Sequence, residues 1–360
     1  MSVPSLKVMI VDDSIVYRSQ LKMALEGNPR IEITGNASNG KIALQKLEQI
    51  PVDLMVLDLE MPVMDGLAVL KAIQQKSIDV KVIIYSSLSP SGVQKSLDAL
   101  NHGAEDFVTK VTDASSVEEA TENIRRNLVP KILQFCPDVK PTTGHTSPVT
   151  QPIAGDTDYI KRDISLLTPQ IVVIASSTGG PQALEKFFSK LTHPLNAPIL
   201  IAQHIPNAFV GPLCERIAKI CNIPCKPAED GAVAQPGTIH MCPGDFHLRV
   251  SLTDDKSVQM NLHQGPKRNS VRPAADELFE SAADIFGTQV VGFVLTGMGA
   301  DGQEGSQYIK ERDGAILIQD EASCTVWGMP RSVYEVGAFD HVGDIYNLGE
   351  VLNDFVGVIK

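Results

Sequence analysis

The chain has 360 residues, a length typical of two domains that each bury their own core. Hydrophobic residues make up 43% and charged residues 21%, which is the composition of a soluble globular protein and excludes a disordered or fibrous chain. The formal net charge of -12 argues against a nucleic-acid-binding function, because phosphate backbones would be repelled.

The six cysteines follow no zinc-ligand spacing and are interpreted as free or buried thiols. The N-terminal segment runs from a short polar lead into an apolar stretch with two aspartates, so no signal peptide is predicted. No apolar run approaches the length that spans a membrane, so the protein is not expected to insert into one. A reducing cytoplasm is therefore the expected location.

From Leu6 to about Leu133, short apolar runs alternate with segments of helical periodicity. The predicted strands lie in KVMIVDD, IEITGNA, DLMVLDLEMP, VKVIIYSS and EDFVTK, and an amphipathic segment follows each of them. Five strand-then-helix units predict an α/β domain with a five-stranded parallel sheet and helices on both faces, the doubly wound, flavodoxin-like architecture.

The periodicity stops after this domain, and residues 134–167, rich in Pro, Thr, Gly and Asp, are interpreted as a linker. A second strand and helix series then begins, with main strands predicted in QIVVIASS, APILIAQH and QVVGFVLTGMG. The short pieces GTIHMC, FHLRVSL and SVQMNLH indicate a small antiparallel addition. We therefore predict two doubly wound domains, over residues 1–133 and 168–360, the second mostly parallel α/β.

Charged side chains end the predicted strands of the first domain. Asp12 and Asp13 end the first strand, Asp58 the third and Lys110 the fifth. Because these ends share one crevice, a hard cation such as Mg2+ would offset the repulsion between the carboxylates. Asp58 would then attack a phosphoryl donor while the metal and Lys110 neutralise the transferring oxygens. A solvated turn is the alternative for Asp12 and Asp13 taken alone, but several coincident positions argue against it.

Ser86 ends the fourth strand, where its hydroxyl would donate a hydrogen bond to the new phosphoryl group and bias a two-state surface. These positions, with LEMPVMDGL after Asp58, resemble response-regulator receivers. The resemblance implies that a sensor histidine kinase phosphorylates Asp58, that Asp12, Asp13 and Asp58 bind Mg2+, and that Ser86, Phe107 and Lys110 form the switch. Val111 stands where that family usually has proline, which leaves its usual cis bond open.

The second domain contains a tight turn between a buried strand and a helix, SSTGGPQAL, which places a serine at the crevice. A serine needs a histidine to take its proton and a carboxylate to orient that histidine. His204, at the end of PILIAQH, and Asp301, after VVGFVLTGMGA, are the best placed. Alternatively, Ser176, Ser177 and Thr178 simply cap the helix that follows.

The strings SSTGGPQAL, AQHIP, CPGDFHL, VRPAADELF, LTGMGADG and EASCTVWGMPRSV resemble the chemotaxis response regulator protein-glutamate methylesterases, the CheB family, over nearly the full chain. The resemblance implies Ser177 as nucleophile, His204 as general base and Asp301 as its orienting partner. Backbone N–H groups near Met298 and Thr178 would bind the oxyanion. The esterase would need no cofactor.

That family hydrolyses glutamate γ-methyl esters on methyl-accepting chemotaxis receptors, releases methanol, and in some members deamidates glutamines. The resemblance implies that the unphosphorylated receiver inhibits the esterase and that phosphorylation at Asp58 activates it. Ala175 and Ser176 stand where relatives often have Gly-Ala, so Ser176 competes as nucleophile, and Ala300 stands where they have Asn.

Two other functions stay open at this point, a phosphorylation-dependent binding module and a DNA-binding regulator, the second disfavoured by the negative charge. Arg268, Asn269 and Arg272 either hold an acidic receptor surface or are exposed residues with no such role.

Overall fold

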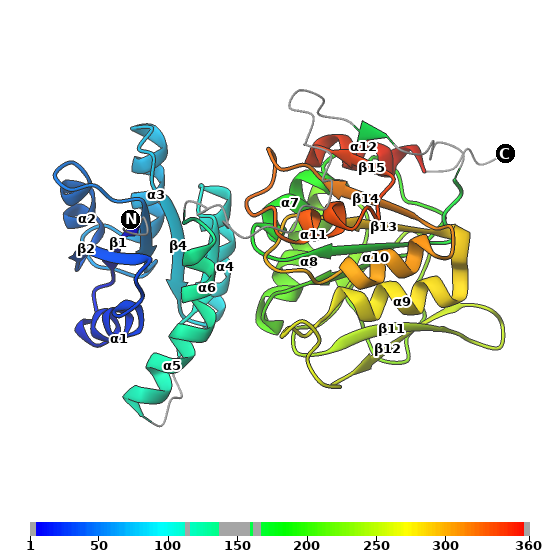
Figure 1. Cartoon of the computed structure of the whole chain (residues 1–360), viewed down its shortest axis with the longest axis horizontal. Helices are drawn as coiled ribbons and strands as arrows, with labels where there is room; N and C mark the ends of the chain where they lie inside the picture. Colours follow the sequence, from blue (N-terminus) through cyan, green and yellow to red (C-terminus); the bar gives the residue numbers. More distant parts are fainter. Residues whose placement is uncertain (1–4, 112–115, 137–158, 161–166, 356–360) are drawn as a thin grey trace, which may run out of the picture. The chain divides into compact units, whose positions relative to one another are not determined.

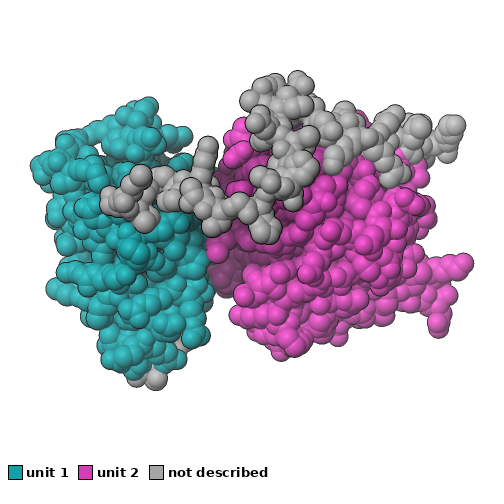
Figure 2. Space-filling model, in the orientation of Figure 1, with its two compact units in different colours: residues 1–145 teal, residues 146–360 magenta. Residues whose placement is uncertain are grey.

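The computed structural model describes residues 5–111, 116–136, 159–160 and 167–355, and for residues 159–160 only the backbone. The chain divides into two compact units, residues 1–145 and 146–360 (Figures 1 and 2). The division falls inside the segment predicted to be a linker. In the described part of the chain, no helix has both the length and the apolar character needed to cross a bilayer.

The first unit is a five-stranded, fully parallel sheet in the order β2-β1-β3-β4-β5. The central strands are buried on both sides, as expected where helices cover both faces of a parallel sheet. This confirms the predicted architecture. The strands are β1 (Leu6–Val11), β2 (Ile31–Ala37), β3 (Leu54–Leu57), β4 (Lys81–Ser86) and β5 (Asp106–Thr109), and the helices are α1 (Ile15–Leu25), α2 (Gly40–Leu47), α3 (Gly66–Gln75), α4 (Pro90–Asn101), α5 (Val117–Asn127) and α6 (Val129–Leu133).

The second unit contains a larger sheet in the order β6-β15-β14-β13-β7-β8-β10-β9, in which only β6 is antiparallel to its neighbour. Its strands are β6 (Tyr159–Ile160), β7 (Ile171–Ser176), β8 (Ile199–Gln203), β9 (Cys225–Pro227), β10 (Ile239–Met241), β13 (Val290–Val294), β14 (Ala315–Gln319) and β15 (His341–Gly343). A separate antiparallel pair is formed by β11 (His247–Leu252) and β12 (Val258–His263). The prediction of a mostly parallel α/β domain with a small antiparallel addition is confirmed.

The helices of the second unit are α7 (Gly180–Phe188), α8 (Asn207–Cys221), α9 (Ala275–Phe286), the 3-10 helix η1 (Gly287–Gln289), α10 (Gln303–Lys310), α11 (Met329–Glu335) and α12 (Ile345–Asp354). One amphipathic helix, α9, packs between the hairpin β11–β12 and the main sheet (Figure 1). Its apolar face places Leu278 and Phe279 in the same buried cluster as Val250 and Met260 of the hairpin. The small hairpin therefore holds α9, and with it the residues at the start of α9, against the sheet.

Three differences from the sequence prediction concern short elements. The piece GTIHMC joins the main sheet as β10, parallel to β8, instead of pairing with the hairpin strands. The sheet also continues beyond the predicted last strand through β14 and β15. A two-residue strand, β6, lies inside the predicted linker and pairs antiparallel with β15, while the remainder of that linker from residue 137 to 166 is outside the described residues.

The order of the strands creates a crevice at the carboxyl edge of the second sheet. The chain passes from β7 to β8 on one side of β7, whereas β13 pairs with β7 on its other side. Loops that leave neighbouring strands in opposite directions open a crevice between them, and ligands bind at such switch points. The loops after β7, β8 and β13 meet there.

A buried histidine away from this edge makes the stability of the second unit pH-dependent. His240 on β10 is fully buried, and neither ring nitrogen has a hydrogen-bond partner among the described residues. Burial lowers its pKa from 6.5 to about 4, and Lys226 adds to this effect. Below pH 6.5 the unfolded chain therefore binds a proton at this residue that the folded chain does not.

We expect the free energy of unfolding to fall as the pH is lowered from 6.5 towards 4, by about 3 kcal/mol from this residue. Above pH 6.5 the contribution of His240 should be constant. His240→Leu should remove this part of the pH dependence in urea unfolding curves, while exposed His193→Leu should keep it. Equal slopes for His240→Leu and the unsubstituted chain would contradict the prediction.

Candidate functional site

The acidic residues predicted in the first unit lie together at the carboxyl ends of β1 and β3. One carboxylate oxygen from each of Asp12, Asp13 and Asp58 lies within 4.8 Å of the others. The Lys110 Nζ atom is 2.8 Å from Asp12 Oδ2 and 2.9 Å from Asp58 Oδ2. Asp12 and Asp58 are buried, whereas Asp13 is exposed. The structure thus brings together all four charged residues that the sequence analysis had selected.

The burial of this cluster changes its protonation. Burial raises the pKa of Asp58 to about 6, because Lys110 only partly offsets the loss of water and Asp12 adds repulsion. Burial also raises the pKa of Asp12. Burial alone would lower the pKa of Lys110, but Asp58 and Asp12 hold it above its ordinary value. Three convergent carboxylates are an oxygen donor set that suits Mg2+.

The predicted switch residues lie on the strands next to this cluster. The Ser86 hydroxyl is 2.6 Å from the Ser96 hydroxyl on α4, and Ser96 donates its own hydrogen to the Gly92 carbonyl, 2.7 Å away. The Ser86 hydroxyl is therefore the donor in this pair, and its hydrogen bond links β4 to α4. Phe107 is buried on β5 beside β4. The Lys110–Val111 bond is trans, since Arg272–Pro273 is the only cis bond in the described part of the chain.

In the second unit, the predicted catalytic residues all follow strand ends at the crevice. Ser177 comes directly after β7, and His204 comes directly after β8. The two strands end level with each other, because the His204 N–H donates to the Ser176 carbonyl, 3.0 Å away. Asp301 lies in the loop after β13, and its Oδ2 atom is 2.8 Å from His204 Nε2. The fold thus joins a histidine and a carboxylate separated by 97 residues.

Ser177 follows the strand next to the one that precedes His204, but between these two described side chains the structure shows no hydrogen bond. Ser177 is partly exposed, and among the described residues no hydrogen bond joins its side chain to His204. Because Asp301 occupies Nε2, Nδ1 is the ring nitrogen that is left to accept the serine proton. Catalytic hydrogen bonds often tighten only when substrate binds.

Ser176, the competing nucleophile, is in a different environment. It is fully buried, and its hydroxyl donates to Gln203 Oε1 over 2.6 Å. A hydroxyl enclosed in this way has no access to a substrate in the crevice. The helix-capping alternative also finds no support, because α7 begins after Gly179 and shows no side-chain capping bond.

Asp301 is an ionised, rigidly held carboxylate. It is 2% exposed, and besides His204 it accepts hydrogen bonds from the backbone N–H groups of Ala275 and Asp276 at the start of α9 and from the Asn269 amide. Burial on its own would raise the pKa of Asp301, but His204 and the N–H groups of α9 hold it below the ordinary value. A carboxylate with this many donors has a fixed orientation, which is what an orienting partner for a histidine requires.

A second buried carboxylate, Asp276, was not singled out from the sequence. Its Oδ1 atom accepts from the N–H groups of Gly302 and Gly305 at the start of α10, 3.0 and 2.7 Å away. Asn269 bridges the two acids, with Nδ2 at 2.8 Å from Asp276 Oδ2 and 3.2 Å from Asp301 Oδ1. Burial and repulsion from Asp301 raise the pKa of Asp276 to about 7. Asn269, although exposed, therefore bonds to both carboxylates of the site.

The two residues proposed for the oxyanion lie on loops at the same edge. Thr178 is buried, and its carbonyl accepts from the Thr296 hydroxyl on the loop after β13. Met298, on that same loop, is 39% exposed. The two loops are in direct contact, because the Ser177 N–H donates to the Thr296 carbonyl at 3.0 Å. Their shared position is compatible with the predicted role, which stays a prediction.

The arginines near the crevice are engaged within the unit. Arg268 lies within 4.0 Å of the carboxylates of Asp276, Glu277, Glu280 and Glu304. Arg272 bonds to Asp245 and to two backbone carbonyls. Both guanidinium groups are thus already paired with acceptors of the same unit.

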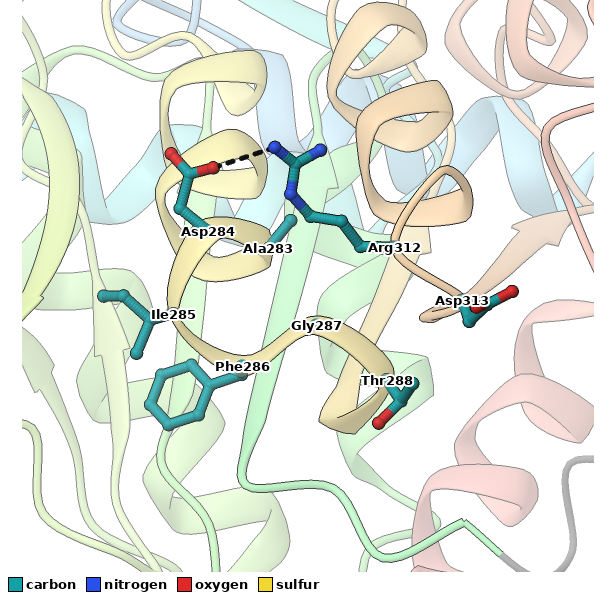
Figure 3. Close-up of a pocket in the computed structure, with 8 residues that line it drawn as sticks. All are labelled: Ala283, Asp284, Ile285, Phe286, Gly287, Thr288, Arg312 and Asp313. Carbon is teal, nitrogen blue, oxygen red and sulfur yellow. Dashed lines mark hydrogen bonds and ion pairs between the residues drawn. The ribbon is translucent and has the colours of Figure 1, made fainter.

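A shallow hollow lies at the opposite edge of the sheet (Figure 3). It is lined by Ala283, Asp284, Ile285, Phe286, Gly287, Thr288, Arg312 and Asp313. Asp284 and Arg312 pair with each other in it at 3.1 Å. These residues precede the starts of β13 and β14, so the hollow is separate from the crevice that contains Ser177.

The fold and these two sites define a receiver unit joined to an α/β unit with a serine, a histidine and an aspartate at its carboxyl edge. Two family models agree with that division: the response regulator receiver domain matches residues 8–122, and CheB methylesterase matches residues 172–352. The chain is 39% identical to the protein-glutamate methylesterase/protein-glutamine glutaminase of Trichodesmium erythraeum, over 98% of this chain and 100% of that protein. The protein of the same name from Thermotoga maritima is 35% identical, with 98% of each chain covered.

A solved structure agrees with the second unit. The crystal structure of the Thermotoga maritima CheB methylesterase catalytic domain is 38% identical and covers 53% of this chain and 100% of that domain, with a TM-score of 0.51. The chain belongs to the CheB methylesterase family, with a response regulator receiver domain as its first unit. The resemblance inferred from the sequence is thereby confirmed.

The environment of Asp301 leads to a specific prediction. Asp301→Asn should lower the kcat for ester hydrolysis by about 10³–10⁴-fold. The amide NH2 group cannot accept from both His204 Nε2 and the Ala275 N–H, so the His204 ring loses the partner that fixes its orientation. It should also lower the free energy of unfolding by about 1–3 kcal/mol for the unsatisfied buried groups. The matched control, Asp254→Asn on the exposed β11–β12 turn, should change neither quantity. Wild-type kcat in Asp301→Asn would contradict the assignment.

Proposed function

We propose that this protein is a phosphorylation-activated protein-glutamate methylesterase. It hydrolyses glutamate γ-methyl esters on methyl-accepting chemotaxis receptors, releases methanol, and acts on receptor glutamines as a deamidase. The observation that carries the proposal is the placement of Ser177, His204 and Asp301 at three adjoining strand ends, with the bond between His204 and Asp301 already formed. The names of the relatives support the choice of substrate.

The chemistry follows from the order of these groups. His204 Nδ1 accepts the proton of the Ser177 hydroxyl as Oγ attacks the ester carbonyl carbon, and Asp301 stabilises the resulting imidazolium through Nε2. His204 returns the proton to the departing methoxide, which leaves as methanol. A water molecule, deprotonated by the same histidine, then attacks the acyl-enzyme and releases the glutamate carboxylate and Ser177. With glutamine as substrate, ammonia replaces methanol as the leaving group.

The oxyanion formed on the carbonyl lies where α7 begins. The positive end of the α7 dipole, at Gly180, would favour the negative charge of this oxyanion. Backbone N–H groups near Thr178 and Met298 would complete the oxyanion site, as predicted from the sequence. Glycine at 179, with a φ of 74°, makes the turn from strand to helix possible.

Two serine substitutions test the proposed nucleophile. Ser177→Ala should reduce methanol release from methylated receptor membranes by at least about 10³-fold, because no other hydroxyl replaces Oγ. Ser176→Ala, which alters a buried hydrogen bond next to it, should reduce release by no more than about tenfold. If Ser177→Ala kept wild-type methanol release, the assignment of Ser177 as nucleophile would be wrong. If the unsubstituted chain released no methanol, the second unit would be better described as a phosphorylation-dependent binding module.

The receiver is proposed to switch this activity. A sensor histidine kinase transfers a phosphoryl group to Asp58, and Asp12, Asp13 and Asp58 would hold Mg2+. When bound, Mg2+ neutralises charge on the transferring oxygens. Lys110 already contacts Asp58 at 2.9 Å and contributes a second positive charge. Without phosphorylation, the receiver restrains the esterase, an effect inferred from the family resemblance.

The switch is tested on the full chain with a small phosphoryl donor. Addition of acetyl phosphate and Mg2+ should raise methanol release from receptor membranes, whereas Asp58→Asn should stay at the basal rate because it lacks the nucleophilic carboxylate. Removal of residues 1–150 should raise basal release without any donor. An equal response of Asp58→Asn and the unsubstituted chain would contradict the assignment of Asp58.

A further inference from the structure

The side chain of Gln203, the last residue of β8, connects the two loops that carry the proposed nucleophile and base. Gln203 is 1% exposed. Its Nε2 atom donates to the carbonyl of Ser177 over 3.0 Å and to the carbonyl of His204 over 3.2 Å. Its Oε1 atom accepts from the Ser176 hydroxyl over 2.6 Å. All the hydrogen bonds of this one amide are therefore made at the point where β7 and β8 separate.

The orientation of the amide follows from its partners. Two of these partners are carbonyl oxygens, which only accept, so the atom facing them must be the NH2 group. The third partner is a hydroxyl, which can donate to the oxygen at the other side. A flipped amide would place oxygen against two carbonyls. Only one orientation satisfies the site.

The position of these bonds matters because the strand ladder ends there. The last paired residues of β7 and β8 are Ser176 and Gln203, and the His204 N–H makes the final backbone bond to Ser176. Beyond this point, only the Gln203 amide links the backbones of Ser177 and His204 among the bonds the structure describes. If the Gln203 amide is removed, the carbonyls of Ser177 and His204 both lose the hydrogen bond that Nε2 donates to them.

Gly180, the first residue of α7, makes room for this amide. A Cβ atom at position 180 would lie 2.0 Å from Gln203 Oε1, 2.8 Å from its Cδ and 3.0 Å from its Nε2. The Gly180 N–H also donates to the Ser177 carbonyl over 2.8 Å. An added methyl group would thus displace the Gln203 side chain while leaving its chemistry unchanged.

We infer that Gln203 is a positioning residue for the esterase, and that Gly180 is required because it leaves space for the Gln203 amide. The amide fixes the backbones of Ser177 and His204 relative to each other, so that Oγ and the imidazole start within reach of proton transfer. This inference rests on the proposed function of Ser177 and His204. Misplacement of reacting groups by about 1 Å can cost about a hundredfold in rate.

A double-mutant cycle tests the inference on the full chain. Gln203→Ala and Gly180→Ala should each lower kcat for methanol release about tenfold to a hundredfold, with KM changed less than about twofold, because Gln203 is 1% exposed and offers no surface to a substrate. The double variant should be no slower than Gln203→Ala alone, since the three atoms nearest to the added methyl group all belong to the Gln203 amide and are then gone. Multiplied effects in the double variant would overturn the inference.

A second readout is independent of receptors. The rate at which Ser177 reacts with a fluorophosphonate probe reports the alignment of nucleophile and base, and it should fall in both single variants in parallel with kcat. The matched control is Gly211→Ala in α8, where an added Cβ meets no atom within 4 Å, and it should react at the wild-type rate. Melting temperatures separate a loss of alignment from a loss of folding.

The outcomes distinguish this inference from the proposed function. If the unsubstituted chain releases no methanol and does not react with the probe at Ser177, the proposed function fails. If it does both, and folded Gln203→Ala does so at the same rates, the inference about Gln203 is wrong. Should Gln203→Ala fail to fold, Gln203→Met keeps a similar volume but has no donor for the carbonyls, and wild-type kcat in that variant would equally overturn the inference.

Discussion

The organisation of the second site depends on the interaction between two helix N-termini and two buried carboxylates. The N–H groups at the start of α9 bind Asp301, which precedes α10, and the N–H groups at the start of α10 bind Asp276, which belongs to α9. Each helix thus supplies the counter-charge for an acid carried by the other. Because α9 is also held by the hairpin β11–β12, the carboxylate that contacts His204 is anchored from several directions.

The two units use buried carboxylates in opposite ways. In the first unit, burial is stronger than the attraction of Lys110, so the pKa of Asp58 is raised and the cluster gains from an added cation. At Asp301 of the second unit, the interactions with His204 and the backbone N–H groups outweigh burial and lower its pKa, whereas burial raises the pKa of the neighbouring Asp276. Buried aspartates in the two units therefore differ in their pKa, which is raised at Asp58 and lowered at Asp301.

The sequence predicted both sheets and the residues at their edges, because strand ends in a doubly wound fold converge by rule. It missed elements whose local signal is short, such as β15 with three residues and β6 with two. It also missed Asp276 and the role of Gln203. An acid in the first turn of a helix and a polar residue at a strand end are common surface patterns, and only folding encloses these two. The roles of the site residues remain predictions.

The hydroxyl of Ser86 has only one hydrogen, and in this structure that hydrogen is given to Ser96 on α4. A new acceptor at Asp58 would compete with α4 for the same atom, so the two bonds exclude each other. Phosphorylation of Asp58 would then be coupled to α4 through the loss of the hydrogen bond between Ser86 and Ser96. If Asp58 is phosphorylated as proposed, α4 is the element that would lose this bond.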